Sequence, residues 1–223
     1  MTTRRPDAPG RQALALFRGA PLGVRVHTRV RWFSAPFPAI AAALPATGRI
    51  LEIGCGHGLF SAYAALAGPG REVLGVDIDA DKIAHGRAAV QGVERLELAV
   101  APDGEVPAGP WDAVVVVDVL YLLPADAQRQ LLAEAASRLA PGGMLVVKEM
   151  GTTPRWKARW NAFQETLSVK VLRITEGSSF DFVPPETTAG WLTDLGLSVQ
   201  AHRLDAGRVH PHHLLVARRG AGG

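Results

Sequence analysis

The chain has 223 residues, of which 48% are hydrophobic and 20% charged, and its formal net charge is +3. This length and composition indicate a single globular unit with a sizeable core and exclude a disordered chain. Cys55 is the single cysteine, which excludes an intrachain disulfide and a cysteine-rich metal site. The sequence shows neither a signal peptide nor an apolar run long enough to cross a bilayer, so we expect a cytoplasmic protein.

Basic residues are concentrated at the front of the chain. Asp7 is the one acid before Ile50, where the arginines are Arg4, Arg5, Arg11, Arg18, Arg25, Arg29, Arg31 and Arg49. We expect residues 1–48 to form a cationic helical extension packed on the main domain. Within it, Met1–Arg11 is predicted to be loose. Leu22–Phe33 has the spacing of a helix, although alternation in its first half also allows an extended conformation.

From Arg49 the chain alternates strands and helices, which is typical of a parallel sheet covered by helices on both faces. Strands are predicted at Arg49–Ile53, Glu72–Asp77, Leu96–Val100, Ala113–Asp118, Met144–Glu149, Leu197–Arg203 and His213–Ala217. Helices are predicted at Ala39–Leu44, from Leu59, from an Asp79 cap to Gln91, at Ala125–Leu139, from Pro154 and at Glu186–Leu195. The main domain is placed at 49–219, followed by a flexible tail at 220–223.

A glycine loop follows the first predicted strand. Gly54, Gly56 and Gly58 alternate there, which permits a sharp turn and a close approach of the backbone to a ligand. Asp77 ends the next strand about twenty residues later, a spacing at which a carboxylate can accept hydrogen bonds from ribose hydroxyls. A dinucleotide fingerprint would need glycine where the chain has Leu59, so NAD binding is disfavoured.

The segment Glu52–Gly58 together with Asp77 resembles the first motifs of class I S-adenosylmethionine-dependent methyltransferases. Trp111–Leu120 resembles that family's fourth strand and the loop after it, and Leu139–Val147 resembles the turn into the fifth strand. The resemblance implies an α/β, doubly wound, mostly parallel seven-stranded sheet with an antiparallel last strand and helices on both faces. It also implies S-adenosylmethionine as the cofactor.

The resemblance assigns cofactor-binding roles to individual residues. They are Glu52, Gly54, Cys55, Gly56, Gly58, Asp77, Ile78, Asp103 and Asp118. Asp77 is expected to bind the ribose, Ile78 to lie against the adenine and Asp118 to lie at the methionine end. Asp103 marks a departure, because Pro102 stands where many relatives carry an acid that contacts the adenine amino group.

The catalytic residue is left open by the sequence. Methyl transfer by in-line displacement depends mainly on alignment, and a base is needed only when the acceptor arrives protonated. The weak candidates are Lys148 and Glu149, at the end of the fifth strand, and His57 in the glycine loop. A surface ion pair between the first two and simple packing of His57 are the alternatives. The histidines within 210–213 are interrupted by a proline and have no carboxylate beside them, so no metal is expected.

Acceptor recognition is predicted to lie before Arg49 and in Gly151–Pro185. The aromatic side chains there that can wall an apolar pocket are Trp32, Phe33, Trp156, Trp160, Phe180 and Phe182, and the arginines that can hold an anion are Arg25, Arg29 and Arg31. Burial of the tryptophans in the core and solvation of the arginines are the alternatives. Residues 154–185 are further expected to act as a cover over the acceptor.

The leading hypothesis is a methyltransferase that acts on an oxygen or nitrogen atom of a small organic or lipid-like acceptor. An RNA or protein methyltransferase is one alternative, although no nucleic-acid-binding module is visible. A non-catalytic S-adenosylmethionine-binding protein is another. The cationic front also suggests peripheral contact with an anionic membrane.

Overall fold

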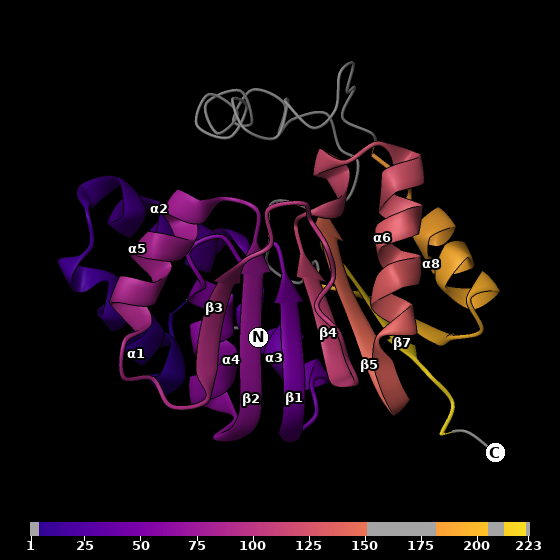
Figure 1. Cartoon of the computed structure of the whole chain (residues 1–223), viewed down its shortest axis with the longest axis horizontal. Coiled ribbons are helices and arrows are strands. Elements are labelled where there is room, and N and C mark those ends of the chain that lie inside the picture. Colours follow the sequence, from indigo (N-terminus) through magenta and orange to yellow (C-terminus); the bar gives the residue numbers. More distant parts are fainter. Residues whose placement is uncertain (1–4, 151–181, 205–211, 222–223) are drawn as a thin grey trace.

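The computed structural model describes residues 5–150, 182–204 and 212–221. At their centre is a seven-stranded sheet in the order β3-β2-β1-β4-β5-β7-β6 (Figure 1). The strands are β1 (Thr47–Ile53), β2 (Gly70–Asp77), β3 (Leu96–Val100), β4 (Trp111–Val117), β5 (Leu139–Met150), β6 (Ser198–Arg203) and β7 (His212–Arg218). Strand β7 runs antiparallel to both of its neighbours, and the other pairs are parallel. The predicted fold class is confirmed.

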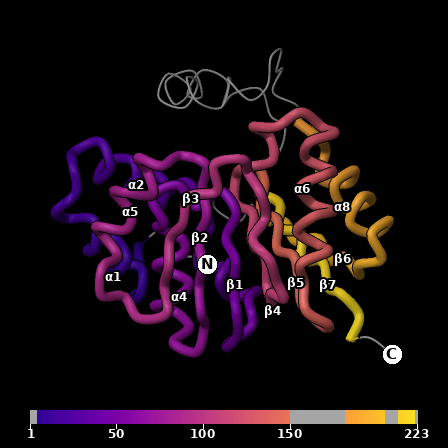
Figure 2. The backbone as a smooth tube through the Cα atoms, in the orientation of Figure 1, coloured from indigo at the N-terminus to yellow at the C-terminus, as the bar shows by residue number. Residues whose placement is uncertain are grey.

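Two groups of helices cover the two faces of the sheet (Figures 1 and 2). The first group is α1 (Ala8–Leu16), α2 (Leu22–Ser34), α3 (Phe37–Ala43), α4 (Leu59–Ala67) and α5 (Ala80–Val90). The second is α6 (Ala125–Ser137) and α8 (Pro185–Asp194), while short 3-10 turns lie at η1 (Phe17–Gly19) and η2 (Leu120–Leu122). None of the helices in the described part of the chain has the length and apolar character needed to span a membrane.

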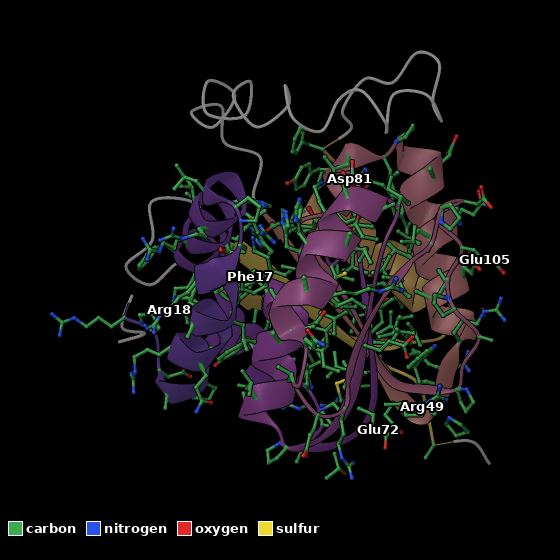
Figure 3. All side chains as sticks on the ribbon, turned by 60° about the vertical axis from the view of Figure 1, so that its left-hand side comes forward. Phe17, Arg18, Arg49, Glu72, Asp81 and Glu105 are labelled. Carbon is green, nitrogen blue, oxygen red and sulfur yellow. The ribbon has the colours of Figure 1, made fainter. Side chains whose placement is uncertain are left out.

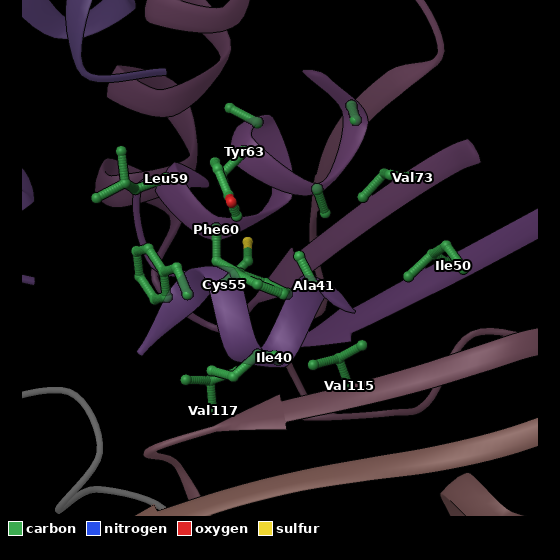
Figure 4. Close-up of a cluster of buried hydrophobic side chains, with 14 of the residues drawn as sticks. Ile40, Ala41, Ile50, Cys55, Leu59, Phe60, Tyr63, Val73, Val115 and Val117 are labelled. Atoms are coloured by element: carbon green, nitrogen blue, oxygen red, sulfur yellow. The ribbon is translucent and has the colours of Figure 1, made fainter. Parts of the chain in front are cut away.

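Strand β4 shows how both faces of the sheet are buried. Val115 and Val117 belong to the core beneath α1–α5, and Val114 and Val116 to the core beneath α6 and α8. Successive side chains of a strand point to opposite faces, so a strand covered on both sides is apolar throughout. Figure 4 shows the first of these cores, in which side chains of α3 and α4 lie over β1, β2 and β4.

Helix α1 shows that the prediction of a loose Met1–Arg11 is wrong from Ala8 onward. The carboxylate of Asp7 accepts hydrogen bonds from the Gly10 amide and from the Tyr63 hydroxyl, both at 2.8 Å. Gly10 also lies so close to Trp32 that a Cβ atom there would be 2.1 Å from the indole. Contacts with distant residues therefore stabilise this short helix, as is usual for helices in proteins.

The remaining elements lie close to their predicted positions. Asp79 caps α5 as expected, since its Oδ1 accepts hydrogen bonds from the amides of Asp81 and Lys82 at 3.0 and 3.2 Å. The segment Leu22–Ser34 is helical throughout as α2, which excludes the extended conformation considered for its first half. Strand β5 begins earlier than predicted, because Leu139 already pairs with Trp111 of β4.

Gly86 allows α5 to pack directly against the glycine loop, and this contact can be tested. A Cβ atom at Gly86 would lie 2.6 Å from the His57 carbonyl oxygen and 2.8 Å from Leu98 Cδ1. We predict that Gly86→Ala destabilises the protein, although alanine in a helix interior is otherwise favoured by about 1 kcal/mol. Gly190→Ala in α8 is the control, since its Cβ would meet no described atom within 4 Å.

Denaturant unfolding should show a lower free energy of unfolding for Gly86→Ala and a gain of about 0.5–1 kcal/mol for Gly190→Ala. Equal gains in both variants would contradict the close packing of α5 on the loop.

Candidate functional site

The loop between β1 and α4 turns on three left-handed glycines. Gly54, Gly56 and Gly58 have φ angles of 73°, 57° and 77°, a region that strongly favours glycine. A Cβ atom at Gly54 would lie 2.4 Å from Val119, and one at Gly58 would lie 2.5 Å from Leu98. At Gly56 no described atom lies within 4 Å of that position. The loop is thus packed against its neighbours at Gly54 and Gly58. Between them, the backbone at Gly56 is open to a ligand.

Asp77 ties this loop to the end of β2. Its Oδ2 accepts a hydrogen bond from the Gly56 amide at 2.7 Å, and its Oδ1 accepts one from the Asp79 amide at 2.9 Å. The amides of Gly54 and Cys55 donate to the Val76 carbonyl oxygen at 2.8 and 3.0 Å. A carboxylate oxygen can accept more than one hydrogen bond, so Asp77 keeps acceptor capacity for a ribose.

Glu52 lies beneath the same loop. It is buried at the end of β1 and accepts a hydrogen bond from the Ser61 hydroxyl of α4, so it links the two elements that the loop joins. Burial raises the pKa of Glu52 to about 7. Burial also raises the pKa of the neighbouring Cys55 thiol, which therefore packs in the loop as an uncharged side chain.

A buried charge cluster forms where β4 ends. Asp118 adopts a φ of 57°, which is uncommon for a residue other than glycine. Its Oδ2 accepts a hydrogen bond from Arg31 Nη1 of α2 at 2.7 Å, and its Oδ1 pairs with Lys148 Nζ of β5. Although burial raises the pKa of Asp118, Lys148 and Arg31 together lower it to about 2. Three segments of the chain are joined through one carboxylate.

Lys148 and Glu149 do not form the surface ion pair considered as their alternative role. Lys148 is 0% exposed and points toward Asp118. The partly buried Glu149 points to the other face of β5, where its Oε1 accepts a hydrogen bond from the Leu120 amide at 3.2 Å. Burial raises the pKa of Glu149 to about 8. Both residues thus hold the segment that follows β4, and their contact with an acceptor stays a prediction.

An aromatic pair lies beside this segment. The rings of Tyr121 and Phe182 are stacked, with centroids 5.6 Å apart and an interplanar angle of 13°. Burial raises the pKa of the Tyr121 hydroxyl, which stays protonated at neutral pH. Phe182 was among the residues predicted to wall an acceptor pocket, and the structure brings it next to the charge cluster.

The other predicted pocket residues have different positions. Trp32 is a core residue, since it is 5% exposed and its ring meets those of Phe37 and Tyr63 edge to face. Phe33, by contrast, is 56% exposed. Trp156, Trp160, Phe180, the helix predicted from Pro154 and most of the predicted cover at 154–185 lie outside the described residues.

Ile78 and Asp103 lie on the β2–β3 side of the glycine loop. Ile78 directly follows Asp77 and is partly buried, and Asp103 is exposed in the turn after β3. The two are near each other, because a Cβ atom at the adjacent Gly104 would lie 4.0 Å from Ile78 Cγ2. The placement suits the predicted adenine side of the site, and contact with the cofactor stays a prediction.

His57 contacts a second histidine that the sequence did not point to. Its Nδ1 lies 3.1 Å from Nδ1 of His27 in α2, and the rings meet edge to face. One of these nitrogens must donate and the other accept, so the hydrogen bond requires a neutral ring on at least one side. Burial lowers the pKa of both His27 and His57 to about 4. Across the described ranges, no group of histidine, cysteine and acidic side chains is arranged to hold a metal ion.

A family model described as a methyltransferase domain matches residues 26–202. The chain belongs to this methyltransferase domain family. It is 29% identical over 161 residues to a ubiquinone biosynthesis O-methyltransferase from Xanthomonas axonopodis pv. citri, covering 70% of this chain and 65% of the relative. It is 34% identical over 145 residues to a ribosomal protein L11 methyltransferase from Syntrophotalea carbinolica, covering 64% of this chain and 45% of the relative. The matched part therefore spans less than two thirds of either relative.

The methyltransferase fold is also similar to that of magnesium protoporphyrin IX methyltransferase from Synechocystis PCC 6803. The TM-score is 0.64 at 19% identity, over 96% of this chain and 95% of the other. These matches confirm the predicted family, and S-adenosylmethionine is the cofactor of that family. The residues fit it, since an open backbone at Gly56 lies beside a carboxylate with acceptor capacity at Asp77.

Some residues of the candidate site were not predicted from the sequence. Ser61, the partner of Glu52, had a usable signal in the sequence, because it is a polar residue within an otherwise apolar first turn of α4. His27 and Tyr121 had none, since their partners lie elsewhere in the chain. Arg31 was expected to hold an anion, and the anion it meets is Asp118.

The charge cluster of Asp118, Arg31 and Lys148 predicts unequal effects of removing Asp118 and of removing Lys148 on stability. Asp118→Ala leaves Lys148 buried without a carboxylate, so we expect a loss of about 3–5 kcal/mol in the free energy of unfolding. Lys148→Met should cost less, because Asp118 keeps Arg31. Glu134→Ala, which removes a surface pair with Arg138, is the control and should cost under about 1 kcal/mol. Urea unfolding measures the free energy of unfolding of all three variants. A loss in Asp118→Ala as small as that of the control would contradict the stabilising role of the cluster.

The histidine pair predicts a pH dependence of stability. The pKa of each ring falls from 6.5 in the unfolded chain to about 4 in the folded one, so the unfolded chain binds more protons between these values. Their contribution is complete above pH 6.5 and is lost as the pH falls toward 4. His57→Gln should therefore reduce the drop in melting temperature over this range, whereas the exposed His202→Gln should not.

Lys82, His85 and Asp79 also face His57, and Arg31 and Lys82 face His27. These groups and the buried carboxyls are the same in each variant, so the difference between melting curves reports the pair. If the melting temperature of His57→Gln fell with pH as much as that of the unchanged protein, the two rings would not titrate as the buried contact requires.

Proposed function

We propose that this methyltransferase domain transfers a methyl group from S-adenosylmethionine to an oxygen or nitrogen atom of a small organic or lipid-like acceptor. The observation that carries the proposal is the glycine loop, whose open backbone at Gly56 is held by Asp77. The relative named as an O-methyltransferase favours oxygen. The neighbour from Synechocystis, which was solved with the demethylated product of the donor, supports the same donor here.

The donor would be held mainly by backbone and by one carboxylate. Gly54–Gly58 would approach it closely, Asp77 would accept hydrogen bonds from the ribose, and Ile78 would lie against the base. When bound, S-adenosylmethionine supplies a methyl group on a positively charged sulfur. What this chain contributes is orientation of the acceptor, and a well-aligned pair of reactants lowers the barrier by on the order of 7–11 kcal/mol in favourable cases.

The acceptor side of the proposal is supported by the surroundings of Asp118. The partly buried ring of Phe182 stacks there on the buried ring of Tyr121 and would supply an apolar wall. The negative charge of Asp118 is compensated by Arg31 and Lys148, so the acceptor would meet no uncompensated negative charge there. These features favour a small aromatic or lipid-like molecule.

A protein acceptor is the second candidate, because the relative with 34% identity is named as a ribosomal protein methyltransferase. The cationic front supports an RNA acceptor less specifically. Incubation with labelled donor and separate pools of phenolic metabolites, lipids, peptides and RNA distinguishes them. We expect label in the small molecules or lipids, and label in peptide or RNA alone would replace this proposal. Donor binding without any product would indicate a non-catalytic protein.

Donor binding gives a direct prediction for Asp77. Asp77→Ala removes a charge-assisted hydrogen bond to the ribose, so the affinity for S-adenosylmethionine should fall by about 1.5–3 kcal/mol. Asp126→Ala, an exposed change at the start of α6, is the control. Titration calorimetry measures both and should detect no binding of NAD. An unchanged donor affinity in Asp77→Ala would remove this residue from the cofactor site.

A further inference from the structure

Helix α2 exposes an apolar stripe. Leu22, Val26, Val30 and Phe33 are 71%, 52%, 57% and 56% exposed, and their spacing places them along one side of the helix. The opposite side, with Val24, Thr28 and Trp32, is buried in the core. A surface helix normally turns polar residues outward, so the apolar outer side of α2 is suited to an apolar environment.

Arginines accompany this stripe. Arg25 and Arg29 follow one edge of it, and Arg18 lies just before the helix with its side chain extended away from the fold (Figure 3). The sequence contains no acid from residue 8 to residue 51. The charge around the stripe is therefore positive and complements an anionic surface.

Apolar side chains beside arginines on one helix face are the chemistry of a helix lying in a membrane interface. A second copy of the chain would bring the same arginines against these in a symmetric contact, and like charges would oppose it. Nucleic acid would meet the phosphate-binding arginines but leave the four apolar side chains without a suitable partner. An anionic lipid surface satisfies both parts of the face.

The inner side of the same helix reaches the candidate site. Arg31 pairs with Asp118 after β4, and His27 meets His57 in the glycine loop. A surface that binds the outer side of α2 is consequently adjacent to the site.

We propose that α2 docks this chain on an anionic bilayer, with the apolar stripe in the interface and the arginines at the lipid phosphates. Delivery of a lipid-like acceptor to the site rests on the proposed function, whereas the docking does not.

Sedimentation of the full chain with vesicles tests the docking. Binding should rise with the fraction of phosphatidylglycerol in phosphatidylcholine vesicles and fall with added salt. Arg25→Gln and Arg29→Gln should each weaken binding about fivefold, and Arg129→Gln on α6 should not. The double change Val26→Asp and Val30→Asp should abolish binding, whereas Leu195→Asp, at a side chain 41% exposed beyond α8, should leave it intact.

Donor affinity and melting temperature measured on the same variants separate this proposal from the proposed function. Loss of vesicle binding with normal donor affinity supports docking through α2. Equal recovery with neutral and anionic vesicles, or no recovery with either, overturns it. Light scattering that shows a dimer dissociated by Val26→Asp and Val30→Asp assigns the face to a second copy, and cross-links from α2 to residues 151–181 assign it to the chain itself.

Discussion

The arrangement of the site depends on the buried carboxylate of Asp118. It receives Arg31 from α2 and Lys148 from β5, so α2, the end of β4 and the carboxyl end of β5 meet at one residue. The left-handed backbone of Asp118 costs on the order of 1–3 kcal/mol and persists only where the surroundings hold it. Two cations do so here, which makes α2 part of the site.

The two sides of the site use different chemistry. The side toward β2 consists of backbone and one carboxylate, with Gly56 and Asp77 at its centre. The side toward β5 consists of compensated charge and aromatic rings around Asp118. Both lie at the carboxyl ends of parallel strands, where an open α/β sheet leaves room for ligands. Helix α2 contacts both sides, through His27 and Arg31.

Local patterns in the sequence predicted the strands, the glycine loop and the Asp79 cap, because each depends on residues close together in the chain. Helix α1 was missed, since Pro9 and Gly10 weaken its pattern and its stability comes from contacts with Tyr63 and Trp32. Arg31 and Asp118 are 87 positions apart in the chain, and only the tertiary packing brings them into an ion pair. For the same reason Lys148 and Glu149 could be selected as candidates from the sequence, whereas their partners, Asp118 and the Leu120 amide, could not.

The hydrogen bond from the Gly56 amide to Asp77 has a consequence for the energetics of binding. An unsupported glycine-rich segment would sample many conformations, and a ligand would have to select one of them at an entropic cost. Here the segment is ordered during folding, by the same carboxylate that is expected to meet the ribose. Donor binding should therefore involve little rearrangement of the backbone. The heat capacity change on binding should then come mainly from desolvation, with only a small part from ordering of the chain.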